Sequence, residues 1–392
     1  MPDSIPKYDI AVVGGGMVGA ALASGLTAQG FTVLVLEQQA PAEFDRDSQP
    51  DLRISAIGAA SVGLLKQLDV WQAVQQMRCA PYRRLETWEW HSVRVNFDAQ
   101  SLGLPELGYM VENSVLQRAL WERLQRQQVN ILSPARLSDL QPHSGGWHLR
   151  LEGGKTVSAR LVVGADGANS QVRQLAGIGI HGWNYTQSCM LISVKCGRDA
   201  GDCTWQQFTP DGPRAFLPLF DGWASLVWYD KPARIRQLQA MNMLQLEKEI
   251  HAHFPARLGQ VTPVTAGAFP LVRRHATRYV LPGLALVGDA AHTINPLAGQ
   301  GVNLGYRDVD ALIETLTASR ARAENWASEA TLLRYQRQRQ RDNLLMQSGM
   351  DLFYFTFSNQ VAPLRIMRNL GLMVAERSGV LKRQALRYAL GL

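Results

Sequence analysis

A glycine-rich turn set between a short strand and a helix is the feature that most constrains how this chain can fold. Residues 8–13 are an apolar run that predicts a buried strand. The spacing G-x-G-x-x-G begins directly after it, at Gly14. Residues 17–28 predict a helix, and residues 32–36 predict a second strand. This β-α-β context favours a dinucleotide-binding turn over an ordinary glycine-rich turn.

Each part of this turn has a physical task. Gly14 permits the tight turn, Gly16 lets the backbone approach a pyrophosphate, and Gly19 lets helix and strand pack closely. The free N–H groups and the positive dipole end of the helix face the phosphates. Glu37, which ends the second strand, is placed to accept hydrogen bonds from a ribose. An acid at that position predicts a nucleotide without a 2′-phosphate.

A second match to the same spacing runs from Gly177 to Gly182. It follows a helical stretch and leads into Trp183, with neither a strand before it nor a helix after it. Because the spacing without that context is weak, we reject this match. The chain therefore predicts one nucleotide fold and no second fold for a nicotinamide cofactor.

Two further fragments place aspartates at strand ends. An apolar strand predicted at residues 156–163 leads into Gly164-Ala165-Asp166-Gly167, and another at 284–287 leads into Gly288-Asp289. A glycine-flanked loop from Pro296 to Asn303 then opens a predicted helix, 302–316. An Asp-Gly pair alone is usually a turn. Together with the first fragment, these aspartates are expected to reach sugar hydroxyls at the carboxyl edge of a sheet.

The chain of 392 residues is 46% hydrophobic, enough for a large core divided between two lobes. No apolar run reaches the roughly 20 residues that a membrane span needs, and no signal peptide is recognisable. We therefore expect a protein that is cytoplasmic or peripheral to the inner membrane. The four cysteines lack C-x-x-C spacing and the His251/His253 pair lacks further ligands nearby, so no metal site is expected.

Positive charge is concentrated near the end of the chain. Residues 361–392 carry six arginines and lysines against the single acid Glu376, and four more arginines lie between 334 and 341. Leu352-Phe353-Tyr354-Phe355 adds apolar side chains beside them. No nucleic-acid motif accompanies the basic residues, so nucleic acid is not expected as a partner. An anionic membrane surface or an acidic partner protein suits the pattern better.

The middle of the chain predicts a sheet rich in aromatic residues. Residues 204–208 and 215–219 flank a Pro-Asp-Gly-Pro turn and predict a hairpin, and residues 224–229 predict a further strand. Their aromatic side chains have two interpretations, an apolar chamber or the filling of a sheet core. The residues concerned are Trp205, Phe208, Phe216, Trp223, Trp228 and Tyr229.

These fragments resemble the FAD-dependent aromatic hydroxylases of the p-hydroxybenzoate hydroxylase class, over nearly the whole chain. The ubiquinone-biosynthesis branch is the most similar, on the stretches Arg53-Ile54-Ser55-Ala56-Ile57, Gly288-Asp289-Ala290-Ala291-His292 and Gly299-Gln300-Gly301-Val302-Asn303. The resemblance implies an α/β fold with a Rossmann-like FAD-binding domain, an inserted β-sheet substrate domain and a helical C-terminal segment. The expected division is 1–78, 108–180 and 272–345 for the FAD-binding domain, 79–107 and 181–271 for the substrate domain, and 346–392 for the basic amphipathic segment.

The resemblance also implies roles for individual residues. Residues expected to contact FAD are Gly14, Gly16, Gly19, Glu37, Arg53, Gln117, Asp166, Asp289, Gly299, Gly301 and Asn303. Asp166 belongs to a motif that also touches the nicotinamide donor, and Asp289 would bind the ribitol. Pro296 would line the reaction chamber. His292 is a candidate proton relay, with a capping or structural role as the open alternative.

The activity implied is hydroxylation of a polyprenyl benzoquinol in ubiquinone biosynthesis. NADPH or NADH would reduce FAD transiently, and molecular oxygen would add at the flavin C4a to give the hydroperoxide that attacks the ring. Other ubiquinone-biosynthesis proteins are expected as partners in a complex. Three alternatives stay open: a sister hydroxylase acting at another ring position, a flavin-dependent reductase of a prenyl lipid, and a flavin-binding subunit without turnover.

Overall fold

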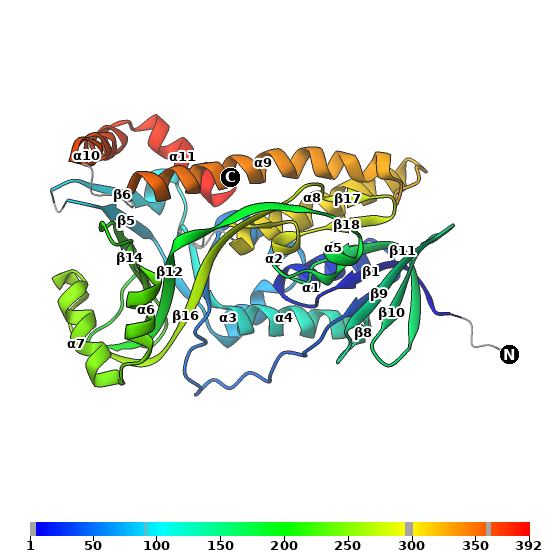
Figure 1. Cartoon of the computed structure of the whole chain (residues 1–392), viewed down its shortest axis with the longest axis horizontal. Coiled ribbons are helices and arrows are strands. Elements are labelled where there is room, and N and C mark those ends of the chain that lie inside the picture. The colour runs from blue at the N-terminus through cyan, green and yellow to red at the C-terminus, as the bar shows by residue number, and fades with distance from the viewer. Residues whose placement is uncertain (1–4, 91, 295–300, 358–361) are drawn as a thin grey trace.

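The computed structural model describes residues 5–90, 92–294, 301–357 and 362–392. Within this part of the chain, two sheets of eight strands and one of three are packed among helices (Figure 1). The first large sheet and its helices lie on one side of the molecule, and the second lies on the other.

The first large sheet confirms the strands predicted around the three fragments. Its strand order is β17-β18-β11-β1-β2-β8, with β10 and β9 added beside β11. The pairs from β18 to β8 are parallel, as in dinucleotide-binding folds. The strands are β1 (Lys7–Val13), β2 (Val33–Leu36), β8 (Asn130–Leu132), β9 (Leu137–His143), β10 (Gly146–Leu151), β11 (Thr156–Gly164), β17 (Val280–Leu281) and β18 (Leu284–Leu286).

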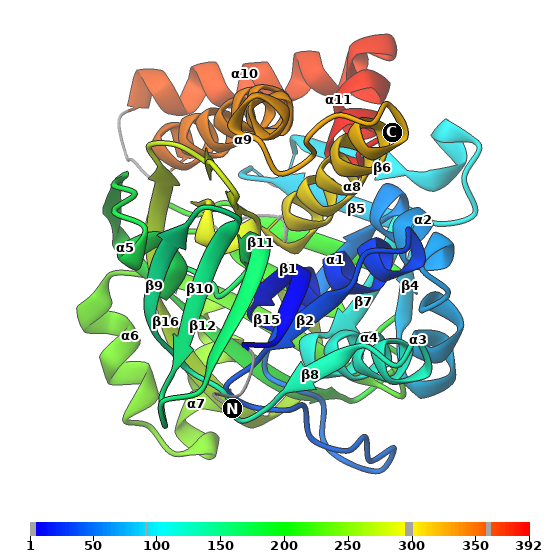
Figure 2. The same cartoon turned by 90° about the vertical axis from the view of Figure 1, so that its right-hand side faces the viewer.

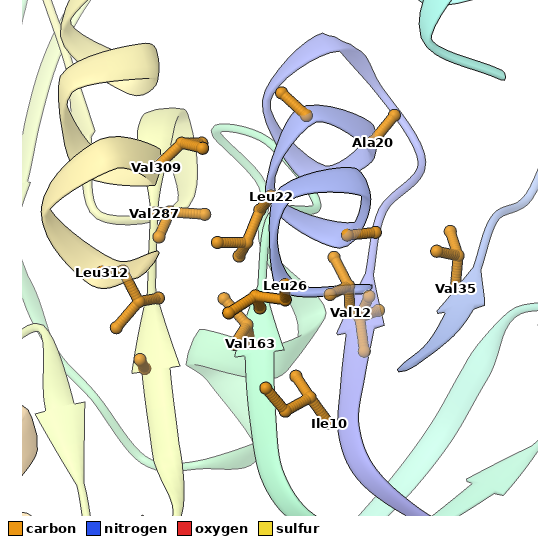
Figure 3. Close-up of a cluster of buried hydrophobic side chains, with 14 of the residues drawn as sticks. Ile10, Val12, Ala20, Leu22, Leu26, Val35, Val163, Val287, Val309 and Leu312 are labelled. Atoms are coloured by element: carbon orange, nitrogen blue, oxygen red, sulfur yellow. The ribbon is translucent and has the colours of Figure 1, made fainter. Parts of the chain in front are cut away.

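Helix α1 (Met17–Ala28) is buried between this sheet and helix α8 (Gly301–Ala321). Leu22 and Leu26 of α1 are fully buried, and Figure 3 shows them beside Val163 of the sheet and Leu312 of α8. The two helices approach so closely that a Cβ atom on Gly25 would lie 2.3 Å from Ile313 Cδ1. Small residues on α1 therefore set the distance between the helices.

The second large sheet has the order β19-β16-β12-β15-β14-β13-β5-β6. Its long antiparallel strands β12 and β16 extend back to the first lobe, where β16 pairs with β19. The predicted hairpin is confirmed, because β13 and β14 pair antiparallel. The strands are β5 (Arg84–Trp88), β6 (Arg94–Asp98), β12 (Ile180–Cys196), β13 (Cys203–Gln207), β14 (Arg214–Pro218), β15 (Trp223–Asp230), β16 (Val261–Ala276) and β19 (His292–Thr293).

Three of the six aromatic side chains named above fill the core on one face of this sheet. Trp205, Phe216 and Trp228 pack in one cluster with apolar residues of α6 (Pro232–Gln239) and α7 (Met243–His253). The other three lie in different clusters: Tyr229 packs with Tyr354, Phe208 with Leu372, and Trp223 beside Leu386 and Leu390. Strand alternation separates the two sets because successive residues face opposite sides.

A third sheet and three helices join the lobes. The strands β3 (Ile54–Gly58), β7 (Gly108–Glu112) and β4 (Ala80–Tyr82) form it in that order. The accompanying helices are α2 (Ala59–Gln67), α3 (Trp71–Met77) and α4 (Asn113–Arg126). The rejected glycine match begins after the short helix α5 (Gln171–Leu175) and runs into the first residues of β12, so it belongs to no β-α-β unit.

The C-terminal part of the chain is helical, and its helices gather on one side of the molecule (Figure 2). They are α9 (Glu329–Phe357), α10 (Ala362–Arg377) and α11 (Val380–Leu390). Helix α9 thus starts before residue 346, where the helical segment was expected to begin. None of the helices described here is both long and apolar enough to cross a membrane. Where one domain ends and the next begins stays a prediction.

Candidate functional site

The residues singled out from the sequence meet at one edge of the first sheet. Parallel strands β18, β11, β1 and β2 are neighbours, and their ends are in register: Val13 lies opposite both Gly164 and Leu36, and Gly164 lies opposite Leu286. Each strand is followed by one sequence fragment. Side by side, the edge therefore presents Asp289, Asp166, the glycine turn and Glu37. Open α/β sheets bind ligands at this carboxyl edge.

The glycine turn leaves no room for side chains except where a ligand would approach. Gly14 has a φ of +102°, and a Cβ atom there would lie 2.4 Å from the Ala165 carbonyl oxygen. A Cβ atom on Gly19 would lie 1.9 Å from the Gly14 carbonyl oxygen. On Gly16 it would meet no described atom within 4 Å. No described side chain caps the N-terminus of α1, so its first N–H groups are available to an anion.

Glu37 and Gln117 hold the same turn from two sides. Glu37 Oε2 accepts the Gly15 N–H at 2.5 Å, and its Oε1 accepts the Gln39 N–H at 2.9 Å. Gln117 Nε2 donates to the Gly15 carbonyl oxygen at 3.1 Å. Trp121, which the sequence reasoning missed, donates to that same oxygen from its Nε1 at 2.7 Å. These contacts fix the path of the backbone and leave further lone pairs on the Glu37 carboxylate.

Asp166 combines a structural contact with an unsatisfied atom. Its Oδ2 accepts the N–H groups of Gln171 and Val172 at 2.6 and 3.1 Å, which caps α5. Its buried Oδ1 has no hydrogen-bond partner in the described part of the chain. Desolvation raises the pKa of this carboxyl, against the lowering effect of its hydrogen bonds. A buried acceptor without a partner is costly, so a hydroxyl donor from a ligand suits it.

Asp289 follows β18 at this edge, and Arg53 immediately precedes β3. The Asp289 side chain is reached by solvent, yet enough protein surrounds it that desolvation raises the pKa of its carboxyl. The neighbouring His292 and Arg53 side chains act in the opposite direction and lower it. The guanidinium of Arg53 stacks over the Phe269 ring of β16 at 4.7 Å. Arg53 therefore lies where the two lobes meet.

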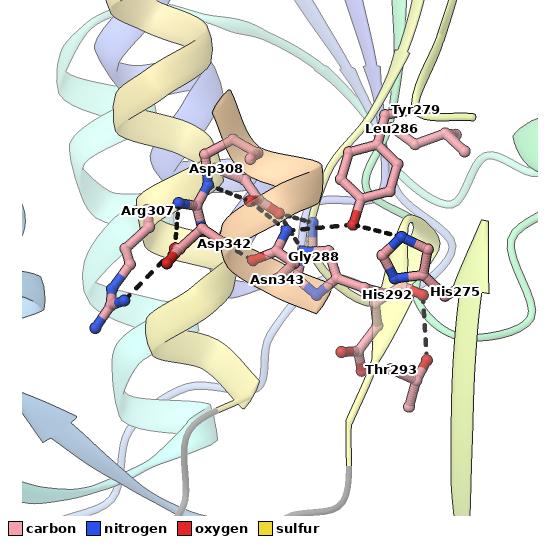
Figure 4. A network of polar contacts seen from close by, with 12 residues as sticks. His275, Tyr279, Leu286, Gly288, His292, Thr293, Arg307, Asp308, Asp342 and Asn343 are labelled. Carbon is pink, nitrogen blue, oxygen red and sulfur yellow. Dashed lines mark hydrogen bonds and ion pairs between the residues drawn. The ribbon is translucent and has the colours of Figure 1, made fainter. Parts of the chain in front are cut away.

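His292 is buried in a polar network behind this edge (Figure 4). Its Nε2 lies 2.5 Å from Asp308 Oδ2, and that oxygen also accepts the Gly288 N–H at 3.0 Å. Asp308 Oδ1 accepts from Arg339 Nε at 2.8 Å. Desolvation would raise the pKa of Asp308, but His292 and Arg339 lower it to about 2. This arrangement favours the structural role for His292 over the proton relay.

The remaining expected residues divide into two groups. Pro296 and Gly299 lie outside the described residues. Gly301 begins α8, and a Cβ atom on it would meet no described atom within 4 Å. The buried Asn303 side chain holds other segments: Oδ1 accepts from Gly58 N at 3.0 Å and Ser61 Oγ at 2.7 Å, and Nδ2 donates to the Ala56 carbonyl oxygen at 2.8 Å. Asn303 thus joins α8 to β3 and α2.

Asp308 is the main residue that the sequence reasoning missed. It lies on α8 four residues after Leu304 and four before Leu312, and all three are fully buried. A carboxylate on the apolar face of a predicted helix is the signal that was available, because such a group must find partners when it is buried.

Comparison with known proteins agrees with this geometry. The family described as "FAD binding domain" matches residues 7–344. The 3-demethoxyubiquinol 3-hydroxylase of Escherichia coli (strain K12) is 69% identical over 385 residues, 98% of each chain. The ubiquinone hydroxylase UbiL of Rhodospirillum rubrum is 38% identical over 98% of this chain and 89% of its own.

Among solved structures, p-nitrophenol 4-monooxygenase PnpA from Pseudomonas putida DLL-E4 superposes with a TM-score of 0.83. It is 19% identical, over 98% of this chain and 99% of that one, so it shows the fold alone. The residues present fit FAD: an open space over Gly16, an uncapped helix N-terminus and an unpaired Asp166 oxygen are what a dinucleotide needs.

Proposed function

We propose that this chain, which belongs to the family of FAD-dependent hydroxylases of ubiquinone biosynthesis, hydroxylates the ring of a 3-demethoxyubiquinol. In other terms the substrate is a 2-polyprenyl-3-methyl-6-methoxy-1,4-benzoquinol. The main support for this activity is the 69% identity to the Escherichia coli enzyme over 98% of both chains. The likeness extends beyond the FAD-binding fold to the second sheet and the C-terminal helices, which are the parts that would meet a substrate.

Bound FAD, reduced by NADPH or NADH, supplies the activation of molecular oxygen. The chain supplies binding and orientation. The glycine turn would hold the pyrophosphate, Glu37 a ribose, and Asp289 the ribitol, with Arg53 and Asp166 also touching the cofactor. Pro296 and Gly299, together with Gly301 and Asn303 at the start of α8, would lie at the ring. A quinol is already activated by its own hydroxyl groups, so we assign no catalytic base.

Apolar side chains from both lobes support a ring-binding chamber. Leu191 and Val227 are cross-strand neighbours on β12 and β15, and both remain partly exposed. Met350 of α9 packs against the same cluster and also against the one that contains Ile294. The chamber that we propose therefore lies between the second sheet, α9 and the flavin edge.

The decisive experiment measures turnover by the purified flavoprotein with a short-chain demethoxyubiquinol analogue. We expect NAD(P)H oxidation and oxygen uptake that both depend on the analogue, with a product heavier by one oxygen atom. A flavin-dependent reductase would consume no stoichiometric oxygen, and a subunit without turnover would oxidise no NAD(P)H in response to the analogue. A sister hydroxylase would add its oxygen at another ring position, which the product structure reveals.

Gly16→Ala supplies the matched control for this assay. Its added methyl group meets no described protein atom within 4 Å, so the fold should be retained. The methyl group would instead occupy the space that a pyrophosphate needs. We expect a folded, colourless protein without turnover, and a yellow, active variant would contradict the proposed cradle.

We further propose that the C-terminal helices rest on an anionic membrane surface at the cytoplasmic side of the inner membrane. Exposed apolar side chains occur on both α9 and α10: Leu345 is 64% exposed, Leu352 68%, Phe355 57% and Val374 68%. Exposed basic side chains accompany them, at Arg341, Arg377, Arg383 and Arg387. Apolar side chains with a basic rim are typical of surfaces that lie on anionic lipid. Since α9 also borders the proposed chamber, it would separate the lipid from the reacting ring.

Co-sedimentation with vesicles tests this surface. The double variant Leu352→Ser, Val374→Ser should bind vesicles containing anionic lipid several-fold more weakly than the original protein. Leu244→Ser is the matched control, because Leu244 is 74% exposed on α7, away from this surface. Unchanged vesicle binding together with loss of co-elution in cell extracts would instead favour other ubiquinone-biosynthesis proteins as the occupants. Truncation is unsuitable, since α10 and α11 contribute buried residues to the core.

A further inference from the structure

We propose that Asp308 is a positioning residue of the flavin site, because it fixes the turn that carries Asp289. The inference rests on the proposed function, in which Asp289 contacts the flavin. Asp308 itself is fully buried in α8, so it acts through other groups.

One carboxylate oxygen of Asp308 holds the turn at two points. Its Oδ2 accepts the N–H of Gly288 at 3.0 Å and contacts Nε2 of His292 at 2.5 Å. These two residues flank Asp289 on either side along the chain. Gly288 has a φ of +58°, a conformation that most residues avoid. A hydrogen bond from this N–H to a charged acceptor stabilises that conformation more than a neutral acceptor would.

Tight packing leaves the turn no freedom to move independently of α8. A Cβ atom on Gly305, less than one helical turn before Asp308, would lie 2.6 Å from Val18 Cγ2. A Cβ atom on Gly288 would lie 3.3 Å from Val18 Cγ1. Val18 follows the glycine turn at the start of α1. Three segments of the cofactor edge thus meet at Val18, and a shift at Asp308 must move the others.

The second oxygen of Asp308 is held by the C-terminal helices. Arg339 Nε donates to Oδ1 at 2.8 Å, and Asn343 Nδ2 donates to it at 3.2 Å, both from α9. Arg339 Nη1 lies 2.6 Å from Asp342 Oδ2, and Tyr388 of α11 donates its hydroxyl to Asp342 Oδ1 at 2.8 Å. A continuous chain of charged hydrogen bonds therefore runs from α11 to the flavin-facing turn, part of it visible in Figure 4.

The substitution Asp308→Asn tests the proposal. It keeps the size of the side chain but removes the negative charge. The new amide N–H group can also point at the Gly288 N–H or the Arg339 guanidinium, both of which are donors. We expect the dissociation constant for FAD to rise about tenfold, which is ~1.4 kcal/mol, and the visible absorption of the bound flavin to shift. Asp310→Asn on the exposed side of the same helix is the control and should bind FAD like the original protein.

The outcomes separate this inference from the proposed function. If the original protein binds no FAD, the proposed function fails. If Asp289→Asn weakens FAD binding while Asp308→Asn binds as tightly as the original with the same spectrum, only the role of Asp308 fails. If Asp308→Asn does not fold, the proposal is tested with Asp342→Asn instead. That substitution weakens the contact between Asp342 and Arg339, and Asp342 is only half-buried. A raised dissociation constant for FAD in that variant supports the proposal, and an unchanged one overturns it.

Discussion

The cofactor edge and the C-terminal helices of this protein are held together by different kinds of contact. At the edge, backbone groups dominate: Gly19 approaches the Gly14 carbonyl so closely that any side chain would collide with it. Where α10 meets the second sheet, a charged pair dominates. Arg368 donates to both carboxylate oxygens of Glu89, and both side chains are almost fully buried. The first region depends on missing side chains, and the second depends on charged ones.

The two regions are therefore vulnerable to different substitutions. The close backbone contacts at Gly14 and Gly19 tolerate no added volume. A buried ion pair tolerates small changes of volume, but the loss of one partner leaves an uncompensated charge in the interior. Three substitutions probe the two regions and the contact between them, in decreasing order of their effect on stability.

Replacing Glu89 by alanine should have the largest effect on stability. Arg368 would stay buried without its carboxylate, at a cost of about 3–5 kcal/mol in the free energy of unfolding. Glu376→Ala is the matched control, because Glu376 also joins α10 to the second sheet through the Asn96 N–H but is partly exposed. We expect the control to lose no more than about 1 kcal/mol. Urea denaturation followed by circular dichroism measures both, and equal losses would remove the proposed contrast.

The seam between the regions should respond to pH through His275. Burial, with the charge of His292 nearby, lowers the pKa of this histidine from 6.5 to about 4. The unfolded chain therefore binds a proton below pH 6.5 that the folded chain refuses until about pH 4. The contribution of neutral His275 to the free energy of unfolding is fully present above pH 6.5. It is lost as the pH falls towards 4, by on the order of 3 kcal/mol.

His275→Gln removes this titration while retaining a polar partner for Gln347, which now lies 2.9 Å from His275 Nδ1. Unfolding free energies of this variant and the original protein, measured from pH 7 to pH 4, should converge as the pH falls. Parallel curves over that range would show that His275 titrates normally.

Gly19→Ala should have the smallest effect on stability of the three, yet it should abolish flavin binding. The added Cβ would lie 1.9 Å from the Gly14 carbonyl oxygen, so that carbonyl must move. Overpacking of this kind lowers the free energy of unfolding by roughly 1–3 kcal/mol. The glycine turn would shift with it. Gly63→Ala in α2 is the control, since its Cβ meets no described atom within 4 Å. It should gain about 0.5–1 kcal/mol from helix propensity. Thermal unfolding and flavin content after gel filtration report both effects.

The same contrast explains what the sequence could predict. The strands and the helix around Gly14 are confirmed, because glycine spacing and apolar runs are local patterns. The Glu89 and Arg368 pair spans 279 residues, so no local pattern announces it. Asp308 gave a weak local signal as a carboxylate on the apolar face of α8. That signal could not say which arginine or backbone N–H would reach it, because its partners come from α9 and from the turn after β18.

The close approach of α1 and α8 has a consequence for protein synthesis. Gly25 of α1 is synthesised soon after translation begins. Ile313, which fills the space over Gly25, is synthesised about 290 residues later. At ribosomal rates of about 5–20 residues per second, that interval is roughly 15–60 s. During this time the face of α1 that packs against α8 has no cover. The nascent chain is therefore expected to recruit holding chaperones, and flavin loading is expected to wait until α8 has emerged.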